Sequence, residues 1–233
     1  MRVGSRARGR LPTDAADFPL VGRLQAHLEA IYGFRCEARA EAFVVVDAEV
    51  AALLGGTGRA PEELLVLEAR GDLEVALYLD PALRERMGRY AGSPLASVLE
   101  GDLDGYCQVT EGVSHFLYVA HTAHLERTVS LLELEAQAEV DKFVVCLLHR
   151  WGEGVAGWAR ELLPRLFDRV AYQPLLSVEE RWRYEEANRL SRRFCTRLMP
   201  HVLDRRLDRL LGDLRYAYRL GAEAKLRHFA HGG

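Results

Sequence analysis

Apolar residues recur every three to four positions over most of the chain, which is the spacing of helices that bury one face. The pattern predicts a first helix over residues 18–32 that stops at Gly33. It also predicts long helices at 103–125, 130–151, 155–171, 178–199 and 202–220, with a short helix at 222–230. The second half of the chain is therefore expected to be a helical bundle.

A β-region is expected between the first helix and this bundle. Two apolar runs flank the turn at 70–72, and the second run alternates apolar and polar residues from Leu73 to Leu79, as in a hairpin. Residues 34–46 are also predicted to be extended, because they end in three consecutive valines. The predicted fold class is α+β, predominantly α, with a hairpin or small antiparallel sheet before the helical bundle.

Several residues mark where helices begin and end. Ser177 with Glu180 three residues later forms a capping box, and Asp80 and Ser93 each precede a proline at the start of a short helix. Pro174 and Pro200 are expected to lie at helix ends. The last long helix carries a stripe interpreted as core packing rather than a coiled coil, formed by Leu203, Leu207, Leu210 and Leu214.

Composition and charge narrow the class of protein. The chain has 233 residues, 49% hydrophobic and 28% charged, which is typical of a globular protein and excludes a disordered or collagen-like chain. Residues 1–15 are predicted to be a disordered basic arm, 16–100 a small α+β region, and 101–233 a helical bundle packed with it as one unit. No apolar run is long enough to span a membrane, so no membrane partner is expected.

The cationic residues are nearly all arginine, because only Lys142 and Lys225 among the 31 are lysine. This bias is typical of a GC-rich, bacterial-type genome and makes the two lysines candidates for chemistry that arginine cannot perform. The four cysteines include no C-x-x-C pair and are interpreted as small buried residues. No apolar segment follows the basic N-terminus, so a cytoplasmic location is expected.

The helices at 103–125 and 130–151 carry the main candidates for chemistry. Glu111, His115 and Tyr118 share one strip of the first helix, and Glu135, Glu139 and Lys142 share one strip of the second. A short connection makes the helices an antiparallel hairpin, which allows a cluster of Glu111, His115, Glu139 and Lys142 if the strips face each other. Glu135 and Tyr118 would then be ligand contacts.

This cluster admits four interpretations. The first is a structural polar network or solvated stripe that fixes the helix register, the second is an acid–base catalytic site, and the third is a recognition surface. Two carboxylates and a histidine could also hold a metal ion, but the repeated Glu-x-x-His spacing and the H-E-x-x-H motif are missing. No metal or other cofactor is therefore predicted.

The helix at 178–199 carries a second set of candidates. Asn188, the only asparagine, is interpreted as a buried bridge between two helices or, with Tyr184, as a ligand contact. Residues 159–233 hold 16 cations against 10 acids. This C-terminal third of the chain could bind the phosphates of a nucleic acid through Arg189, Arg192, Arg193 and Arg197. The acidic residues interleaved with these arginines favour ordinary surface ion pairs instead.

Motifs for nucleotide binding, nucleophilic serine chemistry and protein kinases are missing. The leading hypothesis is a cytoplasmic binding, adaptor or regulatory protein that acts through its helical bundle on a protein partner or by self-association. The first alternative is an enzyme using the Glu/His/Lys cluster. The second is a nucleic-acid-binding protein that uses the arginine-rich C-terminal helices.

Overall fold

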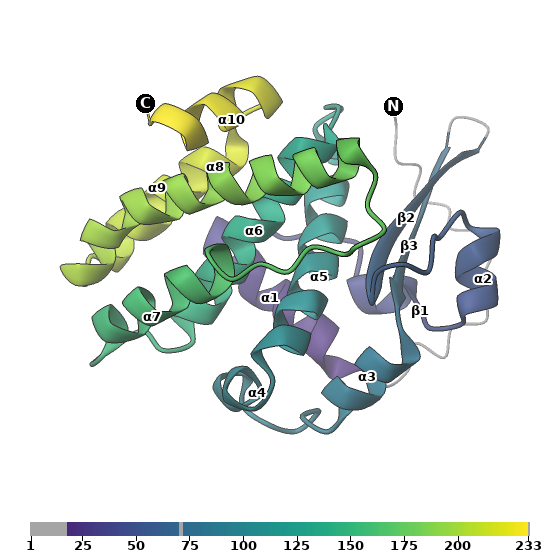
Figure 1. Ribbon diagram of the computed structural model, residues 1–233, viewed down its shortest axis with the longest axis horizontal. Coiled ribbons are helices and arrows are strands. Elements are labelled where there is room, and N and C mark those ends of the chain that lie inside the picture. Colours follow the sequence, from purple (N-terminus) through teal and green to yellow (C-terminus); the bar gives the residue numbers. More distant parts are fainter. Residues whose placement is uncertain (1–17, 70–71, 233) are drawn as a thin grey trace. The chain divides into compact units, whose positions relative to one another are not determined.

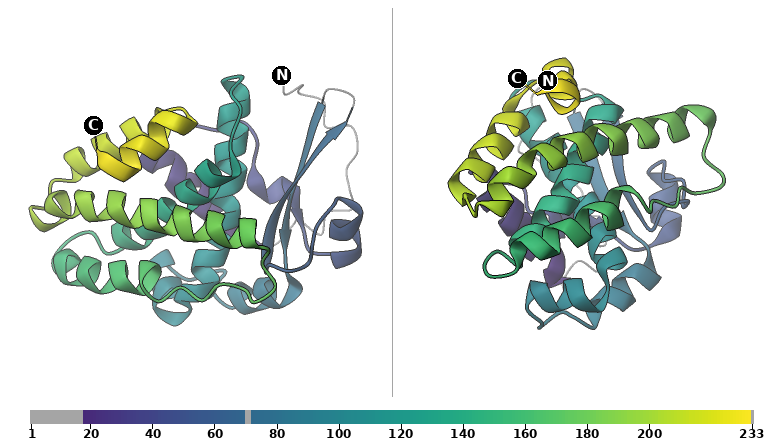
Figure 2. Two further views of the ribbon diagram at one scale, coloured as in Figure 1. Left: turned by 45° about the horizontal axis from the view of Figure 1, so that its top comes forward. Right: turned by 60° about the vertical axis from the view of Figure 1, so that its left-hand side comes forward.

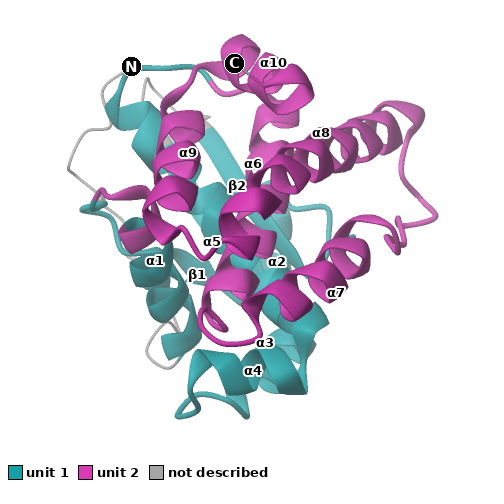
Figure 3. Cartoon of the chain, turned by 90° about the vertical axis from the view of Figure 1, so that its left-hand side faces the viewer, with its two compact units in different colours: residues 1–29, 35–128 teal, residues 30–34, 129–233 magenta. Residues whose placement is uncertain are grey.

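The computed structural model describes residues 18–69 and 72–232 of the chain (Figure 1). The chain divides into two compact units, one of Met1–Glu29 with Arg35–Thr128 and one of Ala30–Phe34 with Val129–Gly233 (Figure 3). Each unit is described by itself below. The basic arm expected at residues 1–15 lies outside the described residues, and the predicted three-part domain division stays a prediction.

The first unit combines a three-stranded sheet with helices. Its elements are most of α1 (Pro19–Tyr32), the 3-10 helix η2 (Ala40–Phe43), β1 (Val44–Val45), α2 (Ala48–Leu53), β2 (Glu62–Ala69), β3 (Asp72–Leu79), α3 (Pro81–Gly88), α4 (Leu95–Gly101) and α5 (Leu103–His124). The sheet order is β1-β3-β2, with β2 antiparallel and β1 parallel to β3. The predicted hairpin is confirmed, and β1 makes the sheet mixed.

The alternation of side chains along β3 gives the sheet two apolar faces. One face forms a small core around Leu65 of β2 and Tyr78 of β3, which packs with Ala51 of α2. The other face meets α5, where a Cβ added at Gly112 would lie 2.8 Å from Leu77 Cδ1. Only glycine therefore allows this close approach of α5 to the sheet, which lies between α2 and α5 (Figure 1).

The second unit is helical. Besides the end of α1, its elements are α6 (Leu131–Leu148), α7 (Val155–Phe167), α8 (Val178–Leu203), α9 (Leu207–Arg219) and α10 (Ala222–His231). The long helix α8 packs against each of the other four, and α6 also contacts α7 and α10 (Figure 2). Five consecutive residues, Phe143–Leu147, are fully buried, which confirms the prediction that this half of α6 is central.

Three details of the expected elements are wrong, and one short helix was not predicted. Residues 34–46 are not one extended segment, because side chains of α1 hydrogen-bond to this loop and leave only β1 in the sheet. The helix that was not predicted is α2, whose first turn is capped by Asp47. Pro200 lies inside α8, which continues because Val202 is fully buried. Leu203 therefore ends α8 and is exposed, outside the core stripe formed by Leu210 and Leu214.

Within the part of the chain that the structure describes, no helix has both the length and the apolar character needed to cross a bilayer.

Candidate functional site

The four predicted catalytic residues belong to two different units. Glu111 and His115 lie one turn apart on α5 of the first unit, where His115 is buried. Glu139 and Lys142 lie on α6 of the second unit. Tyr118, the predicted ligand contact on α5, is fully buried. A single cluster of all four catalytic candidates therefore remains a prediction.

The polar strip between α6 and α8 contains most of the candidates of the second unit. Lys142 Nζ lies 2.8 Å from Glu139 Oε1, so these residues form the expected ion pair on one helix. Arg183 of α8 lies 3.7 Å from Glu135 of α6, which is an ion pair beyond hydrogen-bond distance. The four side chains are only 9–16% exposed, so these charges interact more strongly than surface ion pairs.

Asn188 continues this strip on α8 and bridges two helices, as the sequence predicts. Its Nδ2 donates to the carbonyl of Phe167, the last residue of α7, at 3.0 Å and to the hydroxyl of Tyr172 at 3.3 Å. The carbonyl can only accept, so the amide orientation is fixed. Asn188 Oδ1 is then left buried without a hydrogen-bond donor among the described residues.

Tyr172 brings a phenolic hydroxyl to the same strip. Burial raises its pKa above the ordinary value, and the charge of Glu139 adds to this effect, while the hydrogen bond from Asn188 and the charge of Lys142 oppose it. Tyr172 therefore keeps its proton at neutral pH, so its hydroxyl can donate one hydrogen bond while it accepts the one from Asn188. Tyr184 lies nearby on α8, with the guanidinium of Arg183 5.4 Å from its ring centre.

A second polar network surrounds Lys225 of α10, which is fully buried. Lys225 Nζ donates to Gln137 Oε1 at 2.8 Å, and Gln137 Nε2 donates to Asp141 Oδ1 at 2.8 Å and to the Tyr32 hydroxyl at 3.0 Å. The Tyr32 hydroxyl donates to Asp141, and the ring of Tyr218 stacks on Tyr32 with 3.9 Å between centres.

We call these residues the Lys225 network, and its chemistry is that of a closed structural site. Burial, reinforced by the charge of Asp141, raises the pKa of Tyr32 well above its ordinary value. Lys225, Gln137 and Asp141 are no more than 2% exposed, so substrate has no access to them. The network ties α10 and the end of α1 to α6.

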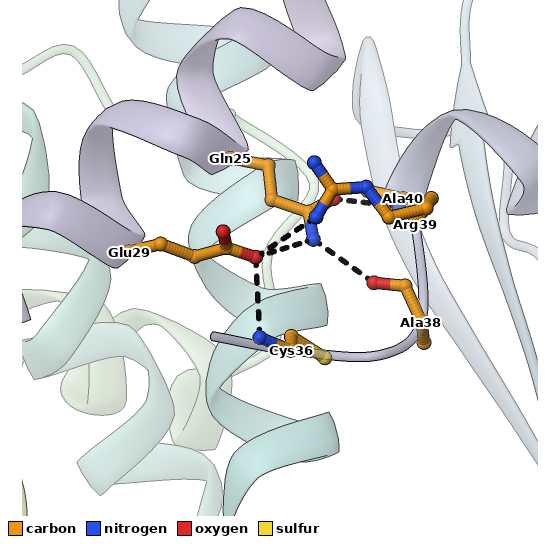
Figure 4. Close-up of polar contacts among 6 residues, drawn as sticks. All are labelled: Gln25, Glu29, Cys36, Ala38, Arg39 and Ala40. Carbon is orange, nitrogen blue, oxygen red and sulfur yellow. Dashed lines mark hydrogen bonds and ion pairs between the residues drawn. The ribbon is translucent and has the colours of Figure 1, made fainter. Parts of the chain in front are cut away.

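The first unit has a polar cluster of a different kind, around Gln25 and Glu29 of α1 (Figure 4). Gln25 accepts from the amide of Ala40 at 2.8 Å and donates to the carbonyl of Ala38 at 2.9 Å. Glu29 accepts from Gln25 at 2.8 Å and from the amide of Cys36 at 3.2 Å, and Arg39 lies 3.2 Å from it. These contacts hold the loop that follows α1 against that helix.

The four arginines expected to bind nucleic acid lie along α8, and three of them have partners inside the unit. Arg189 pairs with Glu186, and Arg192 pairs with Asp168 at 2.6 Å. Arg197 donates to backbone carbonyls near the end of α10, whereas Arg193 is exposed. Ion pairs and capping contacts of this kind fit the surface-pair interpretation better than a phosphate-binding face.

Sequence reasoning missed several residues that the structure places in these networks. Lys225 was singled out as one of only two lysines, but its partners were not: Gln137 and Asp141 are four residues apart on α6 and share one face of that helix. Tyr172 and Arg183 carried no comparable signal, because a loop tyrosine and one arginine among many are unremarkable in this composition.

Comparison with known proteins adds no assignment: no protein-family profile matches the chain, and no curated protein or solved structure matches it significantly.

Proposed function

We propose that this protein is a binding module whose second unit recognises a basic, amphipathic peptide segment of a protein partner. The observation that carries this proposal is a group of large apolar side chains exposed at the start of α8. Leu175 is 78% exposed, Val178 is 88% exposed and Trp182 is 57% exposed. Val178 and Trp182 are four residues apart and share one face of the helix.

Exposed apolar groups gathered within eight residues are a feature of interaction sites, and tryptophan is the residue type most enriched at binding hot spots. We call this group, Leu175, Val178 and Trp182, the Trp182 patch. Its rim is acidic, because Glu179 and Glu185 are exposed beside it. Arg181 lies 4.0 Å from Glu185, and Arg183 is turned to Glu135.

An acidic rim around an apolar centre favours a partner with apolar anchors flanked by lysine or arginine. It disfavours an anionic lipid surface, which would meet the carboxylates. Four free thiols, two of them buried, fit a reducing compartment such as the cytoplasm. The capping box of Ser177 and Glu180 fixes the start of α8 and so holds the Trp182 patch in one orientation.

The acid–base alternative has its own supporting observation. Tyr172 keeps its proton beside Asn188, and the Glu139–Lys142 pair acts on it electrostatically. Against it, the charges of Glu139 and Lys142 are already engaged with each other in an ion pair at 2.8 Å. We therefore prefer the peptide-binding function to the acid–base function. The two functions depend on different residues, so separate substitutions can test them.

The test is fluorescence anisotropy of a labelled, helical Leu/Lys peptide titrated with the full chain, with a Leu/Glu peptide of equal length as its counterpart. We expect saturable binding of the Leu/Lys peptide, weakened about tenfold or more by Trp182→Ala. Glu179→Gln together with Glu185→Gln should weaken binding at low salt more than at high salt. Leu203→Ser, an exposed leucine at the far end of α8, is the matched control.

Two results would overturn the binding function. One is equal affinity for the two peptides, and the other is binding that survives Trp182→Ala unchanged. Lys142→Met should leave peptide binding intact under the proposal, whereas it should abolish any function of the polar strip between α6 and α8.

A further inference from the structure

The three-stranded sheet of the first unit has an outer strand, β2, with a regular backbone. β2 lies at the end of the order β1-β3-β2, and β3 is its only strand partner in the part of the chain that the structure describes. Each of its eight residues lies opposite one residue of β3, from Glu62 opposite Leu79 to Ala69 opposite Asp72. Alternate backbone N–H and C=O groups of β2 therefore point away from β3, where a further strand can pair with them.

β2 lacks the features that usually protect an edge strand. Such strands are commonly blocked by lysine, by proline or by a bulge. The sequence of β2, EELLVLEA, contains neither lysine nor proline and places four apolar residues in a row at 64–67. Val66 is 45% exposed, and Figures 1 and 2 show that the outer end of the β2–β3 hairpin extends past α2. The outer half of β2, residues 65–69, is therefore the part suited to a further strand.

Both faces of this half of β2 offer apolar contacts. Successive side chains of a strand point to opposite faces, so Leu65 and Leu67 lie on the face that packs with α2 and Val66 lies on the other. Leu54, the residue after α2, lines a shallow apolar depression together with Leu65, Leu67 and three residues of β3. A strand added beside β2 would have apolar neighbours on both faces, which favours β-branched residues in it.

The charge of this part of the first unit selects the partner. Residues 40–80, which contain the three strands and α2, include nine acidic residues and two arginines, a net charge of −7. Glu74 of β3 is exposed and lies at the apolar depression. Like charges on neighbouring strands repel each other, so this charge disfavours pairing of β2 with the β2 of a second copy and favours a basic strand.

We propose that an extended segment of a partner protein pairs with the outer half of β2 as a fourth strand of the sheet. The segment has β-branched apolar residues at its centre and lysine or arginine on both sides of them. Backbone hydrogen bonds hold it, while its apolar side chains contact Leu65, Val66 and Leu67. The site belongs to the first unit and is independent of the Trp182 patch.

The test is fluorescence anisotropy of the labelled peptide Lys-Lys-Thr-Val-Ile-Val-Thr-Lys-Lys titrated with the full chain. A peptide with glutamate in place of each lysine is its counterpart and should bind at least about tenfold more weakly. Val66→Lys should weaken binding of the lysine peptide by about tenfold or more, because it removes an apolar contact and adds a like charge. Leu53→Lys is the matched control at a leucine of α2 that is 86% exposed, and it should change the affinity by less than about threefold.

Hydrogen exchange of the wild type tests the pairing without a variant. Saturation with the lysine peptide should slow exchange at amides of residues 65–69, because strand pairing gives their outward N–H groups an acceptor. Trp182→Ala should bind this peptide as tightly as the wild type, which separates the site from the Trp182 patch. Far-UV circular dichroism verifies that Val66→Lys and Leu53→Lys are folded.

The inference is overturned if the lysine peptide shows no saturable binding, or if the two peptides bind equally well. Equal binding by Val66→Lys and Leu53→Lys, or unchanged exchange at residues 65–69 in the saturated protein, would also contradict it. Sedimentation of the wild type and Val66→Lys tests the other occupant. A wild-type dimer that is lost in Val66→Lys would show that β2 pairs with a second copy and would overturn the choice of a basic partner.

Discussion

Each unit contains a group of buried polar side chains. The group around Gln25 and Glu29 in the first unit and the Lys225 network in the second differ in what their side chains hydrogen-bond to. In the first unit, side chains of α1 hydrogen-bond to backbone groups of the next loop, no more than 15 residues away. In the second, side chains hydrogen-bond to each other, and Lys225, Gln137 and Tyr32 are separated by 88 and 105 residues.

This difference separates two uses of polar residues in a core. The Gln25 cluster satisfies backbone groups that a loop would otherwise leave unpaired, so it shapes a local segment. The Lys225 network places a cation and a carboxylate among neutral donors inside a bundle, where each charge depends on its neighbours. Loss of a member should therefore cost more in the second unit than in the first.

The largest effect is expected for Lys225→Met. The substitution keeps the length of the side chain, but it removes the donor to Gln137 and leaves the buried charge of Asp141 less compensated. We expect a loss of about 3 kcal/mol in the free energy of unfolding. Urea denaturation measures it, with Lys142→Met as the control.

Lys142 is the lysine that the sequence placed in the candidate cluster, and it pairs with Glu139 on its own helix. Its substitution should cost about 1–2 kcal/mol, less than that of Lys225, because Glu139 is left 16% exposed and keeps some contact with water. If the two lysine variants lose the same free energy of unfolding, a network that joins several helices is no more important for stability than an ion pair within one helix.

A smaller effect is expected for Gln25→Met in the first unit. This change leaves the amide of Ala40 and the carbonyl of Ala38 without their side-chain partner, at a cost of about 2 kcal/mol. Hydrogen exchange should accelerate at the Ala40 amide. Gln173→Met, at an exposed position, is the control. Unchanged exchange at Ala40 would show that the loop does not depend on this cluster.

The smallest effect is the pH dependence of stability that Tyr32 of the Lys225 network contributes. The pKa of Tyr32 is raised in the folded state above its ordinary value of 10.0, so the folded state keeps this proton where the unfolded chain loses it. The stability from Tyr32 is complete below pH 10 and declines above it by about 1.4 kcal/mol per pH unit.

Urea denaturation of wild type and Tyr32→Phe between pH 8 and about 11 isolates this contribution. The wild-type advantage should shrink as the pH rises through this range, whereas Tyr216→Phe, at an exposed tyrosine, should give a constant difference. A wild-type advantage that stays constant to the highest pH would show that Tyr32 ionises in the folded state as it does in the unfolded chain.

Sequence reasoning identified most of the elements because their causes are local. The apolar period predicted α5, α6 and α8, and Ser177 with Glu180 marked the start of α8, where the capping box is present. The Glu139–Lys142 pair and the bridge made by Asn188 were also foreseen, since spacing along one helix and poor helix propensity are visible in the sequence.

The misplaced features depended on contacts between distant segments. Val202 is buried by tertiary packing, which carries α8 past Pro200. The loop after α1 is shaped by Gln25, so its valines form only a two-residue strand. Of the two lysines, Lys225 lies in the buried network, whereas Lys142 pairs with Glu139 on its own helix and is 13% exposed.

The sequence by itself determined the fold class, the hairpin and the succession of helices, because helical periodicity, capping residues and turn residues act over a few positions. Only the tertiary structure decided which charges are buried and which side chains they meet. Burial is set by the packing of residues separated by about a hundred positions, as Tyr32 and Gln137 are. No spacing along one helix reports such a contact, because its geometry exists only once the helices have packed.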